Sequence, residues 1–220
     1  RALGGETKIA KYGGRSAARG EGNACGRLRL RVGLKENVIR PILQDESFIS
    51  DVERARTLPE HFHLWWLGQS GFLLQWEDRH LLFDPYLSDS LTKKYATTDK
   101  PHVRMTERVV APEKLNFIDV VTSSHNHTDH LDAETLLALM RMNPKIDVVI
   151  PEANREFVTN RLQTAAELPI GLDAGKHATV KGFKISAVPA AHESIEKDAG
   201  GRCKYLGYVV EFGGWTVYHS

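Results

Sequence analysis

The residues best suited to chemistry lie in one short stretch, residues 125–130, which reads His-Asn-His-Thr-Asp-His. Imidazole and carboxylate are the ligand types that borderline divalent metal ions prefer. Alternate side chains of an extended segment point the same way, so His125 and His127 can face one ion. Asp129 and His130 follow directly and can turn toward a neighbouring position. The stretch therefore predicts two metal ions side by side rather than one closed structural site.

A β-forming run over residues 117–121 (Phe-Ile-Asp-Val-Val) immediately precedes this stretch. A strand that leads into a short loop directs the side chains at its carboxyl end into a shared crevice. A solvated loop or a terminal tag can also hold several histidines, but it would lack the apolar strand and the interleaved Asp129. We therefore interpret residues 125–130 as a metal site.

Hydrophobic patterning predicts the elements that would position this site. The expected strands are residues 63–68, 71–76, 80–85, 147–151 and 182–189, with a hairpin of 205–212 and 215–219 around a Gly-Gly turn. The expected helices lie within 41–58, from the N-cap Asp132 to Met142, and over 152–162. Residues 86–112 form a long polar excursion, a feature typical of lids and substrate-binding walls. This order predicts an α/β (α+β) fold in which helices cover sheet layers.

Charge is unevenly distributed along the 220 residues. Residues 1–40 contain ten Lys or Arg against three Glu, and eight of the 18 glycines, whereas the rest of the chain is acidic on balance. We predict a basic, flexible segment over 1–40 and a separate folded domain over 41–220. The segment is compatible with a nucleic-acid-binding arm, with an organellar targeting sequence, or with a solvated leader foreign to the domain. The missing initiating Met suggests a chain that starts inside a longer one.

No apolar run approaches the roughly 20 residues needed to span a membrane, and no signal-peptide core is present. Cys25 and Cys203 lie far apart without a Cys-x-x-Cys pattern, so no disulfide framework is indicated. A reducing cytoplasm is therefore the expected compartment. Nothing in residues 41–220 favours nucleic acid as a partner, although the basic N-terminal segment leaves that interaction open.

Three segments resemble one family. They are Trp65 to Gly71, the His-x-His-x-Asp-His motif with Leu131-Asp132 after it, and Gly213 to Ser220. Together they resemble the metallo-β-lactamase superfamily, and more narrowly its L-ascorbate-6-phosphate lactonase-like branch of metal-dependent hydrolases. The resemblance runs from about residue 60 to the end of the chain. It implies an αββα sandwich of two similar halves, present here as the N-terminal portion of the fold.

The resemblance also implies a ligand set. His125, His127 and His192 would hold the first metal ion, and Asp129 and His130 would hold the second. Asp129 and His130 are accordingly the predicted catalytic residues. Two divalent ions are expected, with zinc as the default and manganese or iron as alternatives, because a carboxylate and open positions are present.

The ligand role of His192, and a supporting role that the resemblance implies for Asp84, both have simpler alternatives. His192 lies in a Pro-Ala-Ala-His context at the end of a predicted strand, where a surface histidine is also common. Asp84 matches a position that braces the metal loop through a metal-bound imidazole. It also reads as a turn residue before Pro85. The other histidines have no motif support and are expected to be exposed or structural. His219 is not assigned as a metal ligand.

For the intact family member, the resemblance implies hydrolysis of a lactone, amide or phosphoester of a small molecule by a hydroxide shared between two metal ions. The enzymatic alternative is a phosphodiesterase similar to the tRNA 3′-processing nucleases or to N-acyl-phosphatidylethanolamine phospholipase D. In the family, a Gly-Asp pair that follows Tyr-His-Ser supplies a bridging carboxylate, and this chain stops at Ser220. A catalytically incomplete fragment or a binding module is therefore the non-enzymatic alternative. A further possibility is a homo-oligomer in which a second copy of the chain supplies the missing metal ligands.

Overall fold

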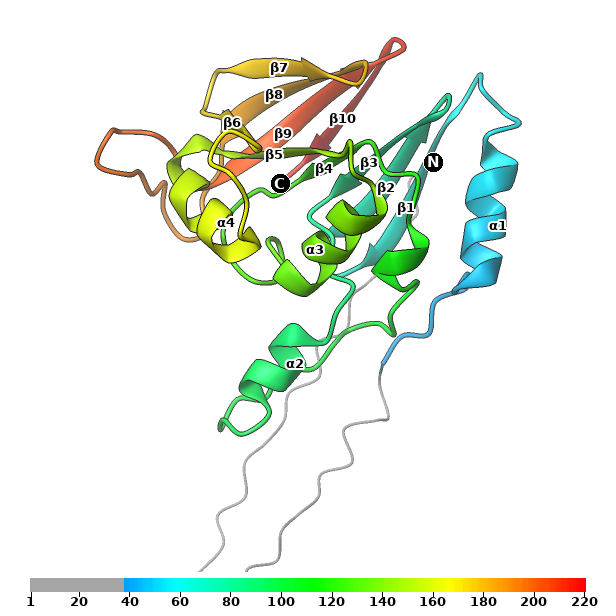
Figure 1. Cartoon of the computed structure of the whole chain (residues 1–220), viewed down its shortest axis with the longest axis horizontal. Helices are drawn as coiled ribbons and strands as arrows, with labels where there is room; N and C mark the ends of the chain where they lie inside the picture. The colour runs from blue at the N-terminus through cyan, green and yellow to red at the C-terminus, as the bar shows by residue number, and fades with distance from the viewer. Residues whose placement is uncertain (1–37) are drawn as a thin grey trace, which may run out of the picture. The chain divides into compact units, whose positions relative to one another are not determined.

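The computed structural model describes residues 38–220, which form two β-sheets and several helices (Figure 1). Of the predicted basic, flexible segment over 1–40, residues 1–37 lie outside the described residues. Within 38–220, no helix has the length and apolar character that crossing a membrane would require.

The first sheet has six strands in sequential order. They are β1 (Phe62–Gly68), β2 (Gly71–Trp76), β3 (Arg79–Phe83), β4 (Val120–Thr122), β5 (Asp147–Pro151) and β6 (Ile170–Leu172). β1, β2 and β3 are antiparallel, whereas β3 to β6 run parallel. Phe83 pairs with Thr122, and Thr122 pairs with Val149, so the carboxyl ends of β3, β4 and β5 meet at one edge.

The second sheet has four antiparallel strands in the order β10-β9-β8-β7. They are β7 (His177–Val180), β8 (Phe183–Pro189), β9 (Leu206–Phe212) and β10 (Trp215–His219). The turn between β9 and β10 contains Gly213 and Gly214, with φ of +50° and +82°. These are left-handed conformations that glycine adopts without steric cost, as the predicted Gly-Gly hairpin requires.

Residues 38–220 contain four α-helices. They are α1 (Glu46–Ala55), α2 (Ser90–Tyr95), α3 (Ala133–Met142) and α4 (Arg155–Leu162), with short 3₁₀ turns η1 (Pro112–Lys114) and η2 (Glu152–Asn154). Of these helices, α1, α3 and α4 pack against the first sheet. The carboxylate of Asp132 accepts a hydrogen bond from the Thr135 backbone N–H, which makes Asp132 the N-cap of α3 as predicted.

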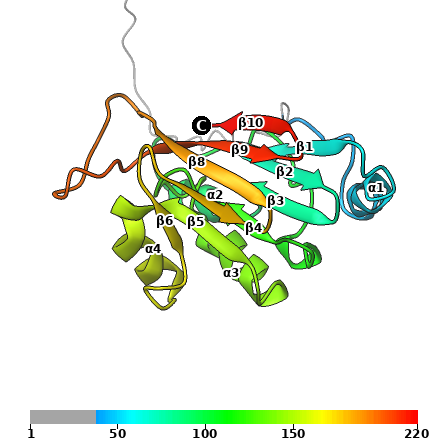
Figure 2. The ribbon, with the colours of Figure 1, turned by 90° about the horizontal axis from the view of Figure 1, so that it is seen from above.

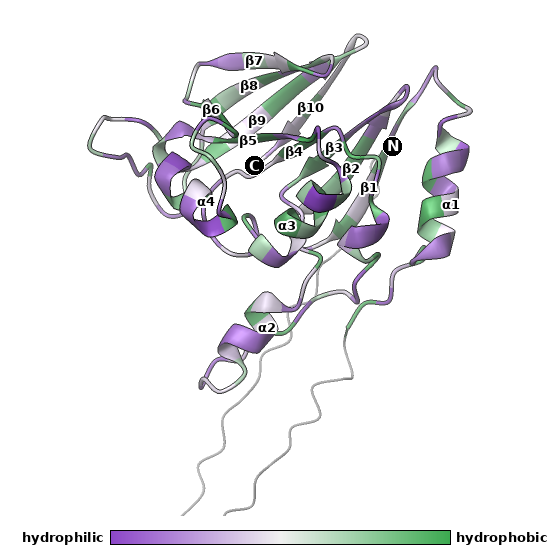
Figure 3. Ribbon diagram, viewed as in Figure 1, coloured by the Kyte–Doolittle hydropathy of each residue, from purple (hydrophilic) through white to green (hydrophobic). Residues whose placement is uncertain are grey.

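Two apolar cores result from the alternation of side chains along the central strands. Leu82, Val121 and Val148 belong to the core between the first sheet and the helices. Their neighbours Leu81 and Val120 belong to the core between the two sheets. Figure 2 shows α3 and α4 on one side of the first sheet and the second sheet on the other. Figure 3 shows that the helices contain both hydrophilic and hydrophobic residues. The mixed α/β fold with sheet layers is confirmed, here as helix–sheet–sheet.

The first helix lies within residues 41–58, as predicted. The structure differs from the predicted elements in three places. β4 begins at Val120, because Phe117 and Asp119 face the amino end of β3 instead. The polar excursion 86–112 contains the helix α2. The strands β6 and β7 are not among the predicted elements, because each has too few residues for a recognisable alternation of apolar and polar side chains.

Candidate metal centre

The parallel pairing of β3 and β4 brings two sequence-distant predictions together. Asp84 follows β3 directly, and the loop of residues 125–130 follows β4 after two serines. Because both segments leave the sheet at the same edge, Asp84 and His130 come into contact although they are 46 positions apart in the sequence. In the second sheet, Leu206 N at the start of β9 donates to Ser124 O at 3.0 Å, which ties that sheet to the same loop.

Four imidazole rings converge at this edge. The ring centroid of His125 lies 4.7 Å from that of His127 and 4.0 Å from that of His130. The centroid of His192, which follows β8, lies 5.2 Å from that of His127. The fold therefore brings together the three imidazoles predicted for the first metal ion, with His130 beside them.

Asp84 is fully buried below these rings. Its Oδ1 accepts from Ser124 N at 2.9 Å and from Thr122 Oγ1 at 3.4 Å. Its Oδ2 accepts from His130 Nδ1 at 2.7 Å and from Ser124 Oγ. The backbone of Asp84 has a φ of +38°, a conformation that non-glycine residues rarely adopt and that tends to occur at functional sites.

The ligand atoms of Asp84, His125 and His130 lie within 4.8 Å of one another, so these three residues are also a possible ligand set. Asp84, however, already accepts four hydrogen bonds, which fill the acceptor capacity of a carboxylate. His130 Nε2 remains directed away from Asp84 and lies 3.8 Å from Asp129 Oδ2. This geometry suits Asp84 as a brace for His130 better than as a ligand.

The protonation of the imidazoles follows from their surroundings. Burial, with a smaller contribution from the neighbouring His130, lowers the pKa of His125 to about 4. Burial also acts to lower the pKa of His130, but the hydrogen bond and charge of Asp84 outweigh it and raise that pKa. His125 is thus neutral at pH 7, the form in which imidazole binds metal, and the donor set fits a divalent ion.

Tyr205 is a member of the cluster that no sequence pattern indicated. Its ring centroid lies 4.9 Å from that of His125, 5.9 Å from that of His127 and 6.1 Å from that of His192. Its carbonyl accepts from Ala190 N at 3.1 Å, two residues before His192. Tyr205 therefore packs against all three imidazoles of the predicted first metal position.

The turn between β1 and β2 closes the opposite side of the loop. Ser70 Oγ donates to Asp129 O at 3.3 Å, and Ser70 O lies 2.9 Å from His219 Nε2. The His219 ring stacks on Phe83 with centroids 4.8 Å apart. His219 is thus buried next to the site but engaged with the turn. Ser70 therefore supports residues 125–130, the predicted metal loop.

A pocket of about 510 Å³ opens beside the metal loop. His127 and Asp129 line it together with residues of the 86–112 excursion and of α4. The excursion residues are Leu91, Lys94, Tyr95 and His102, and the α4 residues are Phe157 and Arg161. The sequence predicts that the excursion forms a wall of a substrate-binding pocket. It gives no signal for His102 or Arg161, because neither residue belongs to a motif.

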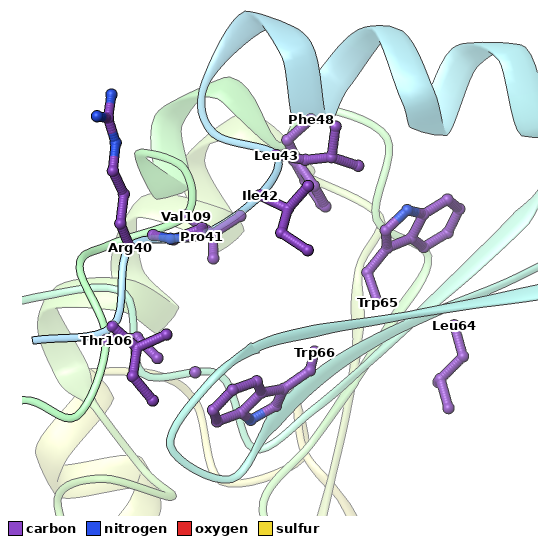
Figure 4. Close-up of a pocket in the computed structure, with 12 residues that line it drawn as sticks. Arg40, Pro41, Ile42, Leu43, Phe48, Leu64, Trp65, Trp66, Thr106 and Val109 are labelled. Carbon is purple, nitrogen blue, oxygen red and sulfur yellow. The ribbon is translucent and has the colours of Figure 1, made fainter.

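A second hollow, of about 410 Å³, lies between residues 39–43, α1 and β1 (Figure 4). Leu43, Phe48, Trp65 and Trp66 give it a largely apolar lining. It shares no lining residue with the pocket at the metal loop and contains no group suited to catalysis.

Residues 63–220 match the family model described as a β-lactamase superfamily domain. A UPF0173 metal-dependent hydrolase of Methanosarcina mazei is 30% identical over 159 residues, which cover 70% of this chain and 58% of the relative. Another UPF0173 metal-dependent hydrolase, from Saccharolobus solfataricus, is 26% identical over 159 residues. That match covers 70% of this chain and 59% of the relative. The chain thus spans about three fifths of the length of these relatives.

Solved structures give the same fold at low sequence identity. A possible metal-dependent hydrolase from Veillonella parvula aligns with a TM-score of 0.51 and 17% identity, covering 72% of this chain and 60% of that one. CmlA, a diiron β-hydroxylase from Streptomyces venezuelae, aligns with a TM-score of 0.53 and 20% identity. The alignment covers 73% of this chain and 29% of CmlA. These likenesses concern the fold alone. Because the family model extends over most of the described residues, the chain belongs to the metallo-β-lactamase superfamily.

Proposed function

We propose that this chain carries the metal-binding part of a metal-dependent hydrolase that acts on a lactone, amide or phosphoester of a small molecule in the cytoplasm. The observation that carries the proposal is the convergence of His125, His127 and His192 beside a pocket that His127 and Asp129 line. The relatives named as metal-dependent hydrolases support the same conclusion.

His125, His127 and His192 would hold one divalent ion, and Asp129 with His130 would hold a second. Zinc is the ion we expect, because imidazole and carboxylate suit it, although manganese and iron accept the same donors. Bound divalent metal would lower the pKa of water to supply a nucleophile at neutral pH and would stabilise negative charge on the reacting oxygen.

The protein's own contribution is to orient these donors. Asp84 accepts a hydrogen bond from His130 Nδ1, which directs Nε2 toward Asp129. Ser70 holds the backbone of Asp129 from the β1–β2 turn. The ligands would therefore be placed before metal binds, and little conformational entropy would be lost on binding.

A substrate panel on the full-length protein, with lactones, esters, amides and phosphodiesters, tests the proposal. His127→Ala removes one proposed ligand, and His177→Ala alters an exposed histidine on β7 as the matched control. We expect metal-dependent turnover that falls by at least about 100-fold in His127→Ala and is unchanged in His177→Ala. Turnover that survives in His127→Ala would refute the metal mechanism. Bound metal without any turnover would favour a binding module.

A further inference from the structure

The pocket beside the metal loop has a marked charge asymmetry. Lys94 and Arg161 provide two cationic side chains, and His102 provides an imidazole. Asp129 is the only carboxylate among the residues that line the pocket, and it is a proposed metal ligand. Within residues 38–220, no carboxylate lies within ion-pair distance of Lys94 or Arg161. The charge of Asp132 acts on Arg161 without forming an ion pair. In the described part of the protein, both cations of this pocket therefore lack a paired carboxylate.

Arg161 has free hydrogen-bonding capacity. Its Nη1 donates to Asn126 O at 3.4 Å, inside the loop of residues 125–130, and to Leu131 O at 3.1 Å, directly after that loop. Its guanidinium carbon lies 4.6 Å from the centre of the Phe157 ring, which fixes the plane of the group. The Nε and Nη2 donors bind no group in residues 38–220. A fixed guanidinium with unused donors is well suited to bind a phosphate or carboxylate.

Lys94 lies on the other wall of the pocket. Its Nζ lies 5.1 Å from the centre of the Tyr95 ring, and both residues belong to α2. The adjacent Lys93 differs, because its Nζ is paired with Glu134 Oε2 at 3.0 Å and it does not line the pocket. Leu91, Tyr95 and Phe157 add apolar surface for the remainder of a ligand.

We propose that this pocket selects substrates that carry an anionic group, a phosphate or a carboxylate, bound between Arg161 and Lys94. The inference rests on the proposed function, because it assigns the reacting bond to the side of the pocket that His127 and Asp129 line. The anion is either the reacting phosphodiester itself or a second group attached to a neutral ester.

Three substrates with the same leaving group separate these possibilities. They are 4-nitrophenyl acetate, 4-nitrophenyl hemisuccinate and bis(4-nitrophenyl) phosphate, assayed on the metal-loaded full-length protein. We expect kcat/KM for at least one anionic substrate to exceed that for the acetate by about 10-fold or more. Lys94→Gln should reduce this ratio about 3- to 10-fold, and Arg161→Gln should reduce it about 10- to 100-fold. Lys93→Gln should leave the ratio unchanged.

Preference for the hemisuccinate identifies a non-reacting anion, and preference for the diester identifies a reacting one. Equal kcat/KM for all three substrates, with no effect of Lys94→Gln, would overturn the inference while the proposed hydrolase function stands. Phenyl phosphate binding, measured by calorimetry, tests the pocket independently of turnover. We expect weaker binding in Lys94→Gln than in Lys93→Gln. Equal affinity in these two variants would overturn the inference even if no substrate is hydrolysed.

Discussion

The Nδ1 atom of His130 lies 2.7 Å from Oδ2 of Asp84, a carboxylate with no solvent exposure that accepts three further hydrogen bonds from Ser124 and Thr122. This contact joins the end of β3 to the loop after β4. It sets the tautomer of His130. A carboxylate can only accept, so Nδ1 must carry the proton and Nε2 is left as the free nitrogen that the proposed metal site would use.

Asp84→Asn should therefore weaken metal binding. The asparagine side chain has the same shape but only one acceptor oxygen. Its NH₂ group would face donors of Ser124 or His130, so the tautomer of His130 would no longer be fixed. We expect a loss of about 10- to 100-fold in zinc affinity, measured by competition with a chromophoric chelator. Asp78→Asn, at an exposed turn residue, is the control. Wild-type affinity in Asp84→Asn would show that the brace does not act on the metal.

Tyr205 should act through the packing of its ring. Tyr205→Phe keeps the ring that contacts His125, His127 and His192, whereas Tyr205→Leu removes it. We expect zinc affinity close to wild type in Tyr205→Phe and a loss of about 3- to 10-fold in Tyr205→Leu. If Tyr205→Phe instead abolishes turnover without changing metal affinity, the hydroxyl group has a catalytic role and the packing role is wrong.

Some of this arrangement was predictable from the sequence, and some was not. The spacing of residues 125–130 and the strands around them are local patterns, so the motif, the N-cap Asp132 and the β9–β10 hairpin could be predicted. Tyr205, Arg161 and His102 reach the site only through the packing of β9, α4 and the excursion around the carboxyl edge of the sheet. No pattern near these three residues distinguishes them from ordinary structural positions.

His80 should make the stability of the protein depend on pH. It is fully buried, and burial, followed by the charge of Arg56, lowers its pKa from the ordinary 6.5 to about 4. The unfolded chain therefore binds a proton at a higher pH than the folded protein does. The stability due to neutral His80 is complete above pH 6.5 and is lost as pH falls toward 4, by about 3 kcal/mol.

Urea unfolding at pH 7 and at pH 5 measures this effect. We expect His80→Leu to lose less stability between the two pH values than the wild type does, because it has no group to protonate at this position. His177→Leu, at an exposed histidine, should retain the wild-type pH dependence. An unchanged pH dependence in His80→Leu would assign the acid sensitivity to other groups.

Asp132 links the pocket wall to the helix after the metal loop. Its carboxylate caps α3 through Thr135 and accepts from Ser90 Oγ in α2 at 2.9 Å. We expect Asp132→Ala to lower the free energy of unfolding by about 1–3 kcal/mol, because buried donors lose their acceptor. Glu134→Ala removes the exposed pair with Lys93 between the same two helices and should cost less than about 1 kcal/mol. Equal losses would contradict this ranking of the two contacts.

Zinc affinity of the histidine variants tests the metal centre most directly. The dissociation constant is measured by chelator competition for the wild-type protein, for His127→Ala and His192→Ala, and for the control His177→Ala. We predict tight binding in the wild type and in His177→Ala, with a loss of at least about 100-fold in each of the other two variants. Equal affinity in all four proteins would contradict a metal centre built by the residue 125–130 loop and His192.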